Sequence, residues 1–160
     1  HSTQQSGRYV YNPFAGETPQ QREGRKPSLA MTAEAMLMQM YLGRSRDDER
    51  LLAGAEYLAA NLPQVGTAQR PLRDCYYWYY ATQAMFQLQG DYWKQWNDAM
   101  RPIVERSQVQ RGPAAGSWHP SQPVRDRWGR EGGRLYVTAL QLLMLEVYYR
   151  HLPLFQELSK

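Results

Sequence analysis

The sequence predicts an all-helical protein in which helical hairpins stack into an array. From residue 28 onward, apolar side chains recur with the three- and four-residue spacing of helices rather than with the alternation of strands. Residues that cap or end helices separate these stretches. Thr32, Thr82 and Thr138 stand in similar apolar surroundings and are separated by 50 and 56 residues, close to the period of helix-pair arrays.

Length and composition indicate one globular domain. The chain has 160 residues, of which 42% are hydrophobic and 21% charged, so we expect neither disorder nor two domains. No apolar run approaches the roughly 18 residues of a membrane-spanning helix, which predicts no membrane span. The aromatic content is high, with 5 Trp, 12 Tyr and 3 Phe, and Trp and Tyr carry polar groups that need partners when buried.

The first 27 residues are expected to form an irregular polar arm, and residues 28–160 a helical domain. Pro and Gly interrupt the arm repeatedly, and only the stretch 8–11 alternates enough to suggest a short strand. The start of the chain has no apolar signal segment, and His1 is not an initiator methionine. We therefore expect the chain to be processed or cut from something longer. Its sequence indicates no compartment.

Two outer and two inner helices are expected before residue 111. The first runs from about Ser28 to Leu42. The second is capped by Ser45, with Asp48 as its capping-box partner, and stops at residue 63. Asp74 is expected to cap the third helix, which ends at residue 90, and Asp91 the fourth, which residues 112–113 terminate. The first and third have wide apolar faces and the others narrow stripes, which predicts an inner and an outer layer.

A fifth helix is expected from about Arg134 to Arg150, after a long Gly- and Pro-rich connection at 111–133. Its apolar residues lie nearly all round the helix, which is typical of a helix buried between other elements. Glu146 lies within this apolar stretch, and we expect Arg150, Arg134 or another loop arginine to pair with it. A functional acid with a pKa raised by burial is the alternative. Glu34, in the first helix, is expected to bond a neighbouring inner helix.

Three stretches carry a resemblance to a known family: DCYYWYYATQAMFQLQGDYWKQW (74–96), QVQRGPAAGSW (108–118) and GGRLYVTALQLLMLEVYYRHLPLF (132–155). Together with the repeat length, they resemble the terpenoid cyclase and protein prenyltransferase superfamily, which includes squalene cyclases, over residues 28–155. The resemblance implies an α/α-toroid of concentric helices. With five expected helices, this chain would form a sector of such a toroid.

The squalene-cyclase repeat motif is matched in part by Gln110, Gly116 and Trp118, with an insertion between the first two. The resemblance implies that Gln110 and Trp118 tie adjacent units together. The family's chemical motifs are not matched. The acidic run 47–49 is explained by the dipole at a helix start, Asp74 and Cys75 lack the residue that separates the zinc ligands, and the complement-type thioester motif is absent.

We therefore expect no catalytic residue, no metal and no cofactor. Cys75 is the single cysteine, which excludes an internal disulfide, and is expected to be a packing residue. The rings of residues 76–80 are expected either to pack the core or to line a central funnel for an apolar isoprenoid or lipid ligand. The candidate lining residues are Tyr76, Tyr77, Trp78, Tyr79, Tyr80 and Tyr136.

A second candidate surface is rich in arginine and tryptophan. The formal net charge is +4, and residues 101–134 contain seven arginines and no lysine. Interleaved Arg and Trp can bind anions or stack with bases, but no nucleic-acid motif accompanies them, so nucleic-acid binding is not expected. Alternatively Asp126 bonds Arg127, Arg130 or Arg134, and the segment is a stitched lid. The candidate polar residues are Asp74, His119, Arg125, Asp126, Arg127, Trp128, Arg130 and Glu146.

These observations favour a non-catalytic helical domain, related to squalene cyclases and prenyltransferases, that acts in binding or as part of a larger protein. The alternative is an isoprenoid- or lipid-processing enzyme whose aromatic-lined pocket is completed by other segments. A partial toroid would leave inner faces without partners, and large exposed apolar patches mark interfaces. The expected partners are therefore a second copy of the chain or the remainder of a longer protein.

Overall fold

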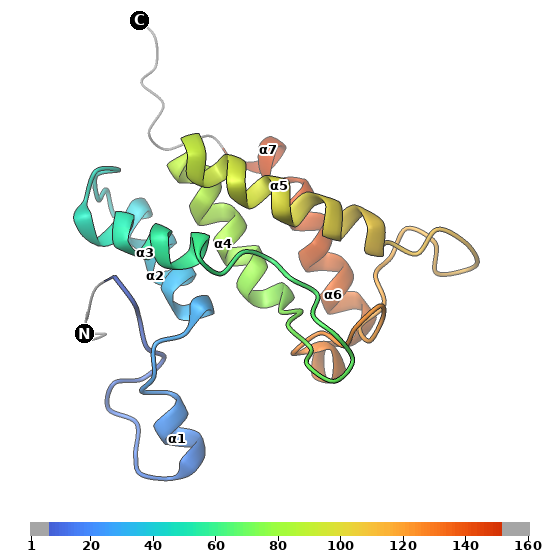
Figure 1. The fold of residues 1–160 in the computed structure, drawn as a ribbon, viewed down its shortest axis with the longest axis horizontal. Helices are drawn as coiled ribbons and strands as arrows, with labels where there is room; N and C mark the ends of the chain where they lie inside the picture. Colours follow the sequence, from blue (N-terminus) through green and yellow to red (C-terminus); the bar gives the residue numbers. More distant parts are fainter. Residues whose placement is uncertain (1–6, 152–160) are drawn as a thin grey trace, which may run out of the picture.

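A computed structural model of the chain describes residues 7–151, and these form helices joined by loops (Figure 1). Within that range, pairing between extended segments is limited to isolated bridges. The all-helical prediction is confirmed. No helix in the described range is both long and apolar enough to cross a membrane.

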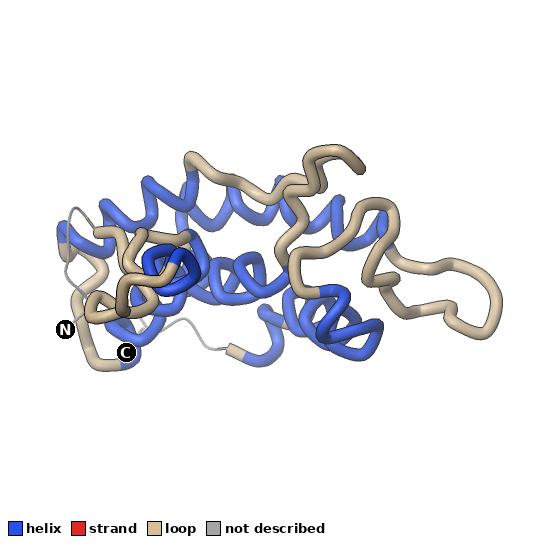
Figure 2. The backbone as a smooth tube through the Cα atoms, turned by 90° about the horizontal axis from the view of Figure 1, so that it is seen from below, coloured by secondary structure: helices blue, strands red, loops and turns tan. Residues whose placement is uncertain are grey.

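The longer helices form two layers, while the connection after α5 projects beyond them (Figures 1 and 2). In one layer α2 and α6 pack on either side of α4, and in the other α3 packs on α2 and α5 packs on α4. The toroid and the hairpin repeat stay predictions. The bounds are α1 Pro19–Glu23, α2 Leu29–Tyr41, α3 Glu49–Ala59, α4 Cys75–Leu88, α5 Gly90–Ser107, α6 Gly129–Leu145 and α7 Val147–Arg150.

Helix α4 is the centre of the core. It packs against α2, α5, α6 and α7, and every side chain from Ala81 to Leu88 is buried. Near its start, the ring of Tyr77 meets Trp96 of α5 edge-on, with 5.6 Å between the ring centroids. A helix surrounded in this way must bury polar groups as well as apolar ones, and each buried polar group needs a partner.

Threonines of the three inner helices accept hydrogen bonds from neighbouring segments. Thr82 in α4 accepts from the indole N–H of Trp96 at 3.0 Å, and both residues are buried. Thr32 in α2 accepts from the backbone N–H of Tyr9, and Thr138 in α6 accepts from that of Trp118. The same three positions carried the weak repeat in the sequence, and each ties an inner helix to the chain packed against it.

The helix starts correct two predicted caps. Helix α2 begins after Ser28 and α4 after Asp74. Each of these side chains accepts a hydrogen bond from the backbone N–H of the third residue after it. Helix α3, however, is capped by Asp48 rather than Ser45, because the Asp48 carboxylate accepts two backbone N–H groups and also pairs with Arg44 at 2.6 Å. Helix α5 begins at Gly90, so Asp91 lies in its first turn instead of capping it.

The prediction that the last helix is enclosed on every side is wrong. Helix α6 ends at Leu145, and Glu146 separates it from α7. Leu135 is 82% exposed and Leu142 46%. The physical reason is that α6 lies at the edge of its layer, with α4 and α5 on one side, so only one stripe packs. The buried stripe of the main segment is Val137, Gln141 and Met144.

The N-terminal arm is held to α2, and the short strand predicted there is reduced to bridges. Tyr9 is buried, and its carbonyl accepts from the N–H of Ser28. Val10 forms a bridge with Pro27. Between them lies α1, whose start is a capping box of Thr18 and Gln21 that the sequence prediction of an irregular arm did not include. The first six residues of the arm lie outside the described range, as do residues 152–160 of the predicted helical domain.

The Thr82–Trp96 hydrogen bond gives a test of how α4 and α5 are held together. Thr82→Val leaves a buried indole N–H without an acceptor, so we expect the free energy of unfolding to fall by about 1–3 kcal/mol. The measurement is urea unfolding of both single variants and of the double variant with Trp96→Phe. We expect the two losses of unfolding free energy to be less than additive, so that the second substitution costs less in a chain that already carries the first. Additive losses would mean that this bond does not join the helices.

Candidate functional site

The aromatic residues at the start of α4 divide between two sides of the helix. Tyr77 and Trp78 are buried, and Tyr77 faces α5. The other three rings are half-buried, and Tyr80 packs edge-on against both Tyr76 and Tyr79, with 5.0 Å between ring centroids in each pair. A helix turns by about 100° per residue, so five consecutive aromatic residues cannot line one cavity.

On the half-buried side, Glu34 of α2 lies against Tyr76. A hydrogen bond from Tyr76 favours the ionised Glu34, yet burial has the larger effect and raises the pKa of this carboxyl. Its Oε1 atom is buried and has no hydrogen-bond partner within residues 7–151. Burial also raises the pKa of Tyr76 and of Tyr136 on α6, so both phenols stay protonated and remain hydrogen-bond donors. Glu34 thus contacts the neighbouring inner helix.

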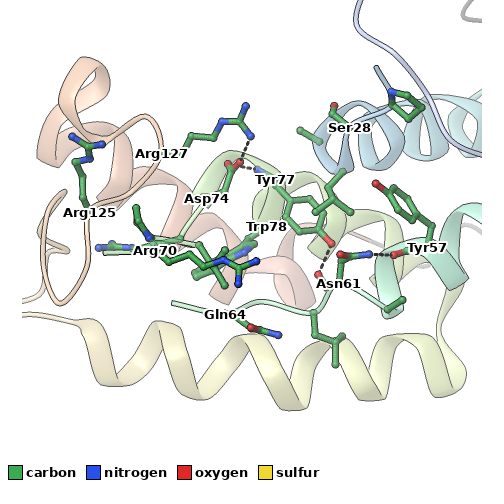
Figure 3. A pocket seen from close by; sticks show the side chains of 18 residues that line it. Ser28, Tyr57, Asn61, Gln64, Arg70, Asp74, Tyr77, Trp78, Arg125 and Arg127 are labelled. Atoms are coloured by element: carbon green, nitrogen blue, oxygen red, sulfur yellow. Dashed lines mark hydrogen bonds and ion pairs between the residues drawn. The ribbon is translucent and has the colours of Figure 1, made fainter. Parts of the chain in front are cut away.

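An open cleft of about 760 Å³ lies on the other side, at the starts of α2 and α4 and the end of α3 (Figure 3). Loop residues 70–73 and two arginines of the connection before α6 complete its wall. Arg125 and Arg127 lie toward one end of the cleft, and Tyr57 and Ser28 toward the other (Figure 3). The lining at the second end is largely apolar and is formed by Pro27, Leu29, Tyr57, Leu62 and Tyr77.

Hydrogen bonds hold the apolar end in shape. The Tyr77 hydroxyl donates to the carbonyl of Asn61 at 2.9 Å, and the Asn61 side chain donates to the carbonyl of Tyr57 at 2.8 Å (Figure 3). The Tyr77 hydroxyl and the Asn61 amide are therefore already engaged within the protein. What remains to contact a molecule in the cleft is mainly ring and aliphatic surface.

Arg73 fastens the loop before α6 to the start of α4. It is 2% exposed, and its Nη1 donates to three carbonyls, those of His119, Gln122 and Val124, at 2.9, 2.7 and 3.3 Å. Its Nη2 is buried without a hydrogen-bond partner in the described part of the chain. No carboxylate there lies within ion-pair distance of this guanidinium.

Asp74 is the acidic residue of the cleft. Its Oδ1 accepts from the N–H of Tyr77 at 3.0 Å as the α4 cap, and its Oδ2 lies 3.4 Å from the guanidinium of Arg127. Burial is the largest influence on this carboxyl and raises its pKa, while the Tyr77 N–H and the Arg127 charge act in the opposite direction. Asp74 therefore serves the helix start and orients Arg127.

Asp126 is fully buried, and it bonds backbone rather than an arginine. Its Oδ2 accepts from the N–H of Cys75 at 2.8 Å and its Oδ1 from that of Trp128 at 3.0 Å. The expectation that Asp126 pairs with Arg127, Arg130 or Arg134 is wrong. The reason is that the start of α4 presents N–H groups without helical partners, and Asp126 lies beside them. The segment is therefore fastened by hydrogen bonds of Asp126, but to the start of α4 rather than to an arginine.

The single thiol belongs to the same corner. Cys75 is buried, and the amide of Gln141 on α6 lies 3.2 Å from its sulfur. Burial, with the nearby Asp126 charge, raises the pKa of the thiol well above its usual value. A protonated, enclosed thiol is a poor nucleophile and a poor metal ligand. Within residues 7–151, no three His, Cys, Asp or Glu side chains are grouped as a metal site would require.

The remaining candidates of the arginine- and tryptophan-rich segment lie apart from the cleft or act locally. The ring of His119 accepts from the N–H of Ser121, and Arg127 lies over the half-exposed ring of Trp128, 5.5 Å from its centroid. Arg130 is exposed. Trp118 is buried and its indole donates to the carbonyl of Val104 at the end of α5.

Two more motif residues and Glu146 have modest roles. Gln110 is exposed and donates only to the carbonyl of Gln108, while Gly116, with φ of 82°, forms the turn that leads back to Trp118. Glu146 makes no ion pair with an arginine in the described range, contrary to expectation. It is only half-buried, because α6 is not enclosed, and so its charge needs no such partner.

The structure thus gathers some of the sequence candidates and adds others. Asp74, Tyr77, Trp78, Arg125 and Arg127 meet in the cleft. Arg70, Arg73, Tyr57 and Asn61 were missed. The signal for the first two was present as a pair of arginines just before a helix cap, in a stretch interpreted only as a loop.

Comparison with known proteins gives the cleft no precedent. No protein-family model matches the chain. No curated protein and no solved structure is significantly similar to it. The resemblance to the terpenoid cyclase superfamily therefore rests on the sequence motifs alone.

The buried thiol gives a prediction about reactivity. Because the pKa of Cys75 is raised in the folded protein, iodoacetamide at pH 8.5 should label the native chain at least about a hundredfold more slowly than the urea-unfolded chain, whose thiol has a pKa of about 8.5. Mass spectrometry over time measures both rates. Comparable rates in the two states would contradict the protonated, enclosed thiol.

Proposed function

We propose that this chain is a non-catalytic helical domain, resembling a sector of a squalene cyclase- or prenyltransferase-like toroid, that acts by binding and takes up a ligand in the α2–α3–α4 cleft. One observation carries the proposal: an open cleft of about 760 Å³ combines an apolar end with a few polar and charged groups. The volume lies within the range of about 300–1,000 Å³ that is common for small-molecule sites, and the four arginines and Asp74 make the lining more polar than in most of them.

The chemistry-bearing side chains near the cleft support binding rather than catalysis. Asp74 caps α4, Asp126 bonds backbone N–H groups, and Cys75 is protonated and enclosed. His119 is engaged by Ser121. Each of these groups has a structural role that accounts for its position, and none is arranged as a nucleophile beside a base.

An isoprenoid- or lipid-processing enzyme is the second candidate, completed by other segments. It is favoured by the half-buried rings of Tyr76, Tyr79 and Tyr80, and by Glu34, which lies against Tyr76 and whose pKa is raised. Aromatic faces can stabilise a cationic intermediate, and an acid with a raised pKa can donate a proton. This candidate places the chemistry on the side of α4 opposite to the cleft.

Exposed apolar side chains on the two flanking inner helices support a further contact with protein. On α6 these are Leu135 and Leu142, and on α2 they are Met38 and Leu42, which is the C-cap of that helix. Apolar side chains gathered on one helix face are typical of interfaces. We propose that they contact a second copy of the chain or the remainder of a longer protein.

The cleft is tested with the neutral fluorescent probe N-phenylnaphthylamine. Leu72 lines the cleft and is 42% exposed, so Leu72→Ser removes apolar contact surface without opening the core. We expect about fivefold weaker probe binding, equivalent to about 1 kcal/mol of lost apolar contact. Phe14→Ser is the control, because Phe14 is 82% exposed in the N-terminal arm and lies outside both the cleft and the proposed protein contact, and it should leave probe binding unchanged.

Two results would contradict this function. Equal losses in both variants would place the probe elsewhere on the protein. Turnover of a polyprenyl substrate, such as squalene or farnesyl diphosphate, by the isolated chain would contradict the non-catalytic proposal and support the enzyme candidate.

The protein contact is tested by sedimentation velocity over a range of chain concentrations. We expect reversible self-association that Leu135→Glu weakens at least about tenfold, since a charge in an apolar contact costs more than 1.4 kcal/mol unless it is paired. Glu49→Gln, an exposed change on α3, is the control. A strictly monomeric profile together with a cooperative thermal transition would show that the domain does not need a second copy, and would leave docking on a longer protein as the partner.

A further inference from the structure

We infer that the cleft binds an organic oxyanion, a carboxylate or phosphate group carried on a small apolar body. The inference rests on the proposed function, since it takes the cleft to be a ligand site and adds the chemistry of the ligand. Four guanidinium groups and one carboxylate line the cleft, those of Arg70, Arg73, Arg125, Arg127 and Asp74. The lining therefore carries an excess of positive charge.

The first step of the argument is the buried guanidinium of Arg73. Three neutral carbonyls accept from its Nη1, while its Nη2 has no hydrogen-bond partner and no carboxylate lies within ion-pair distance within residues 7–151. A buried charge without a countercharge is costly, and its field is weakly screened. The buried Asp126 carboxylate shares this corner beyond ion-pair distance, whereas an anion in the cleft, whose wall Arg73 helps to form, would pair with the guanidinium directly.

The second step is the freedom of the exposed arginines. Arg70 and Arg125 are exposed and form no ion pair in the described part of the chain. Arg127 is exposed as well, and its 3.4 Å contact with Asp74 is long for a charge-assisted hydrogen bond. These guanidinium groups can reorient at little cost toward an oxyanion, whose planar or tetrahedral oxygens match the arginine fork.

The carboxylate of Asp74 limits which part of the cleft the anion occupies. It caps α4 and its Oδ2 lies 3.4 Å from the guanidinium of Arg127, so its negative charge offsets that guanidinium and disfavours an anion close to it. The anionic group is therefore placed toward Arg125, away from Asp74, at the end of the cleft opposite Tyr57 (Figure 3). The apolar body then lies toward Leu29, Leu62 and the Tyr57 ring.

The test is calorimetric titration of the full chain with phenylacetate, phenyl phosphate, phenylacetamide and inorganic phosphate at constant ionic strength. We expect phenylacetate or phenyl phosphate to bind at least about tenfold more tightly than the neutral amide, which has the same apolar body. The stronger of the two identifies the group as carboxylate or phosphate. Inorganic phosphate alone should bind more weakly than phenyl phosphate, because it lacks the body.

Variants locate the site without risking the fold. Arg73→Gln removes the loop fastening and can fail to fold, so the main variant is Arg70→Gln combined with Arg125→Gln, both exposed residues of the cleft. We expect it to abolish the preference for anions over the amide. Arg111→Gln combined with Arg106→Gln, both exposed and outside the cleft lining, removes the same two charges and should leave that preference intact.

Three outcomes would overturn the inference. If the amide and the anions bind equally, the cleft is a ligand site without specificity for anions. The same conclusion follows if the protein binds N-phenylnaphthylamine but none of the anions. Equal loss of anion binding in the Arg106 and Arg111 control would show diffuse attraction by net charge, which salt screens, rather than a site. Failure of the neutral probe and of every anion would instead contradict the proposed function itself.

Discussion

The burial of α4 is the constraint on which the rest of the structure depends. Every side chain from Ala81 to Leu88 is enclosed, so the polar ones among them require partners from neighbouring elements. Thr82 meets the indole of Trp96, and this buried bond, together with the edge-on contact of Tyr77 with the same indole, holds α5 against the helix. Helices α2 and α6 then cover its flanks, each with one packed face and one exposed face. The two-layer arrangement follows from burying α4 and from giving its buried polar side chains hydrogen-bond partners.

The same helix generates the candidate site at its start. The first N–H groups of α4 are satisfied by Asp74 and, across a long sequence separation, by Asp126. Arg73 donates to backbone carbonyls of the loop before α6. Its positive charge is thereby enclosed beside an open cleft. Arg73 therefore stabilises the loop and is also one of the four guanidinium groups that line the cleft. The proposed binding function would therefore depend in part on the residue that also stabilises this corner.

Much of the helical outline could be predicted from residues close together in the chain, and the site could not. Asp74 caps α4 as predicted, and α2 begins at Leu29, within one residue of the expected start at Ser28, because an N-cap depends on the next three residues alone. The predictions at Ser45 and Asp91 are wrong, because the true boundary depends on Asp48 pairing with Arg44 and on the positive φ of Gln89. Asp126 was expected to meet an arginine nearby, yet its partner is the N–H of Cys75, 51 positions away.

The sequence by itself determined that the described chain is helical, where most helices begin, and which threonines recur, since periodicity and capping are local properties. Only the tertiary structure decided that α4 rather than α6 is the enclosed helix, and that the aromatic run divides between a core side and a half-buried side. It alone placed Arg70, Arg73, Arg125 and Arg127 around one cleft. Whether a helix is enclosed, and which side chains meet in a cleft, depends on which segments become neighbours in the fold. The apolar pattern of a helix is compatible with several neighbours and does not specify one of them.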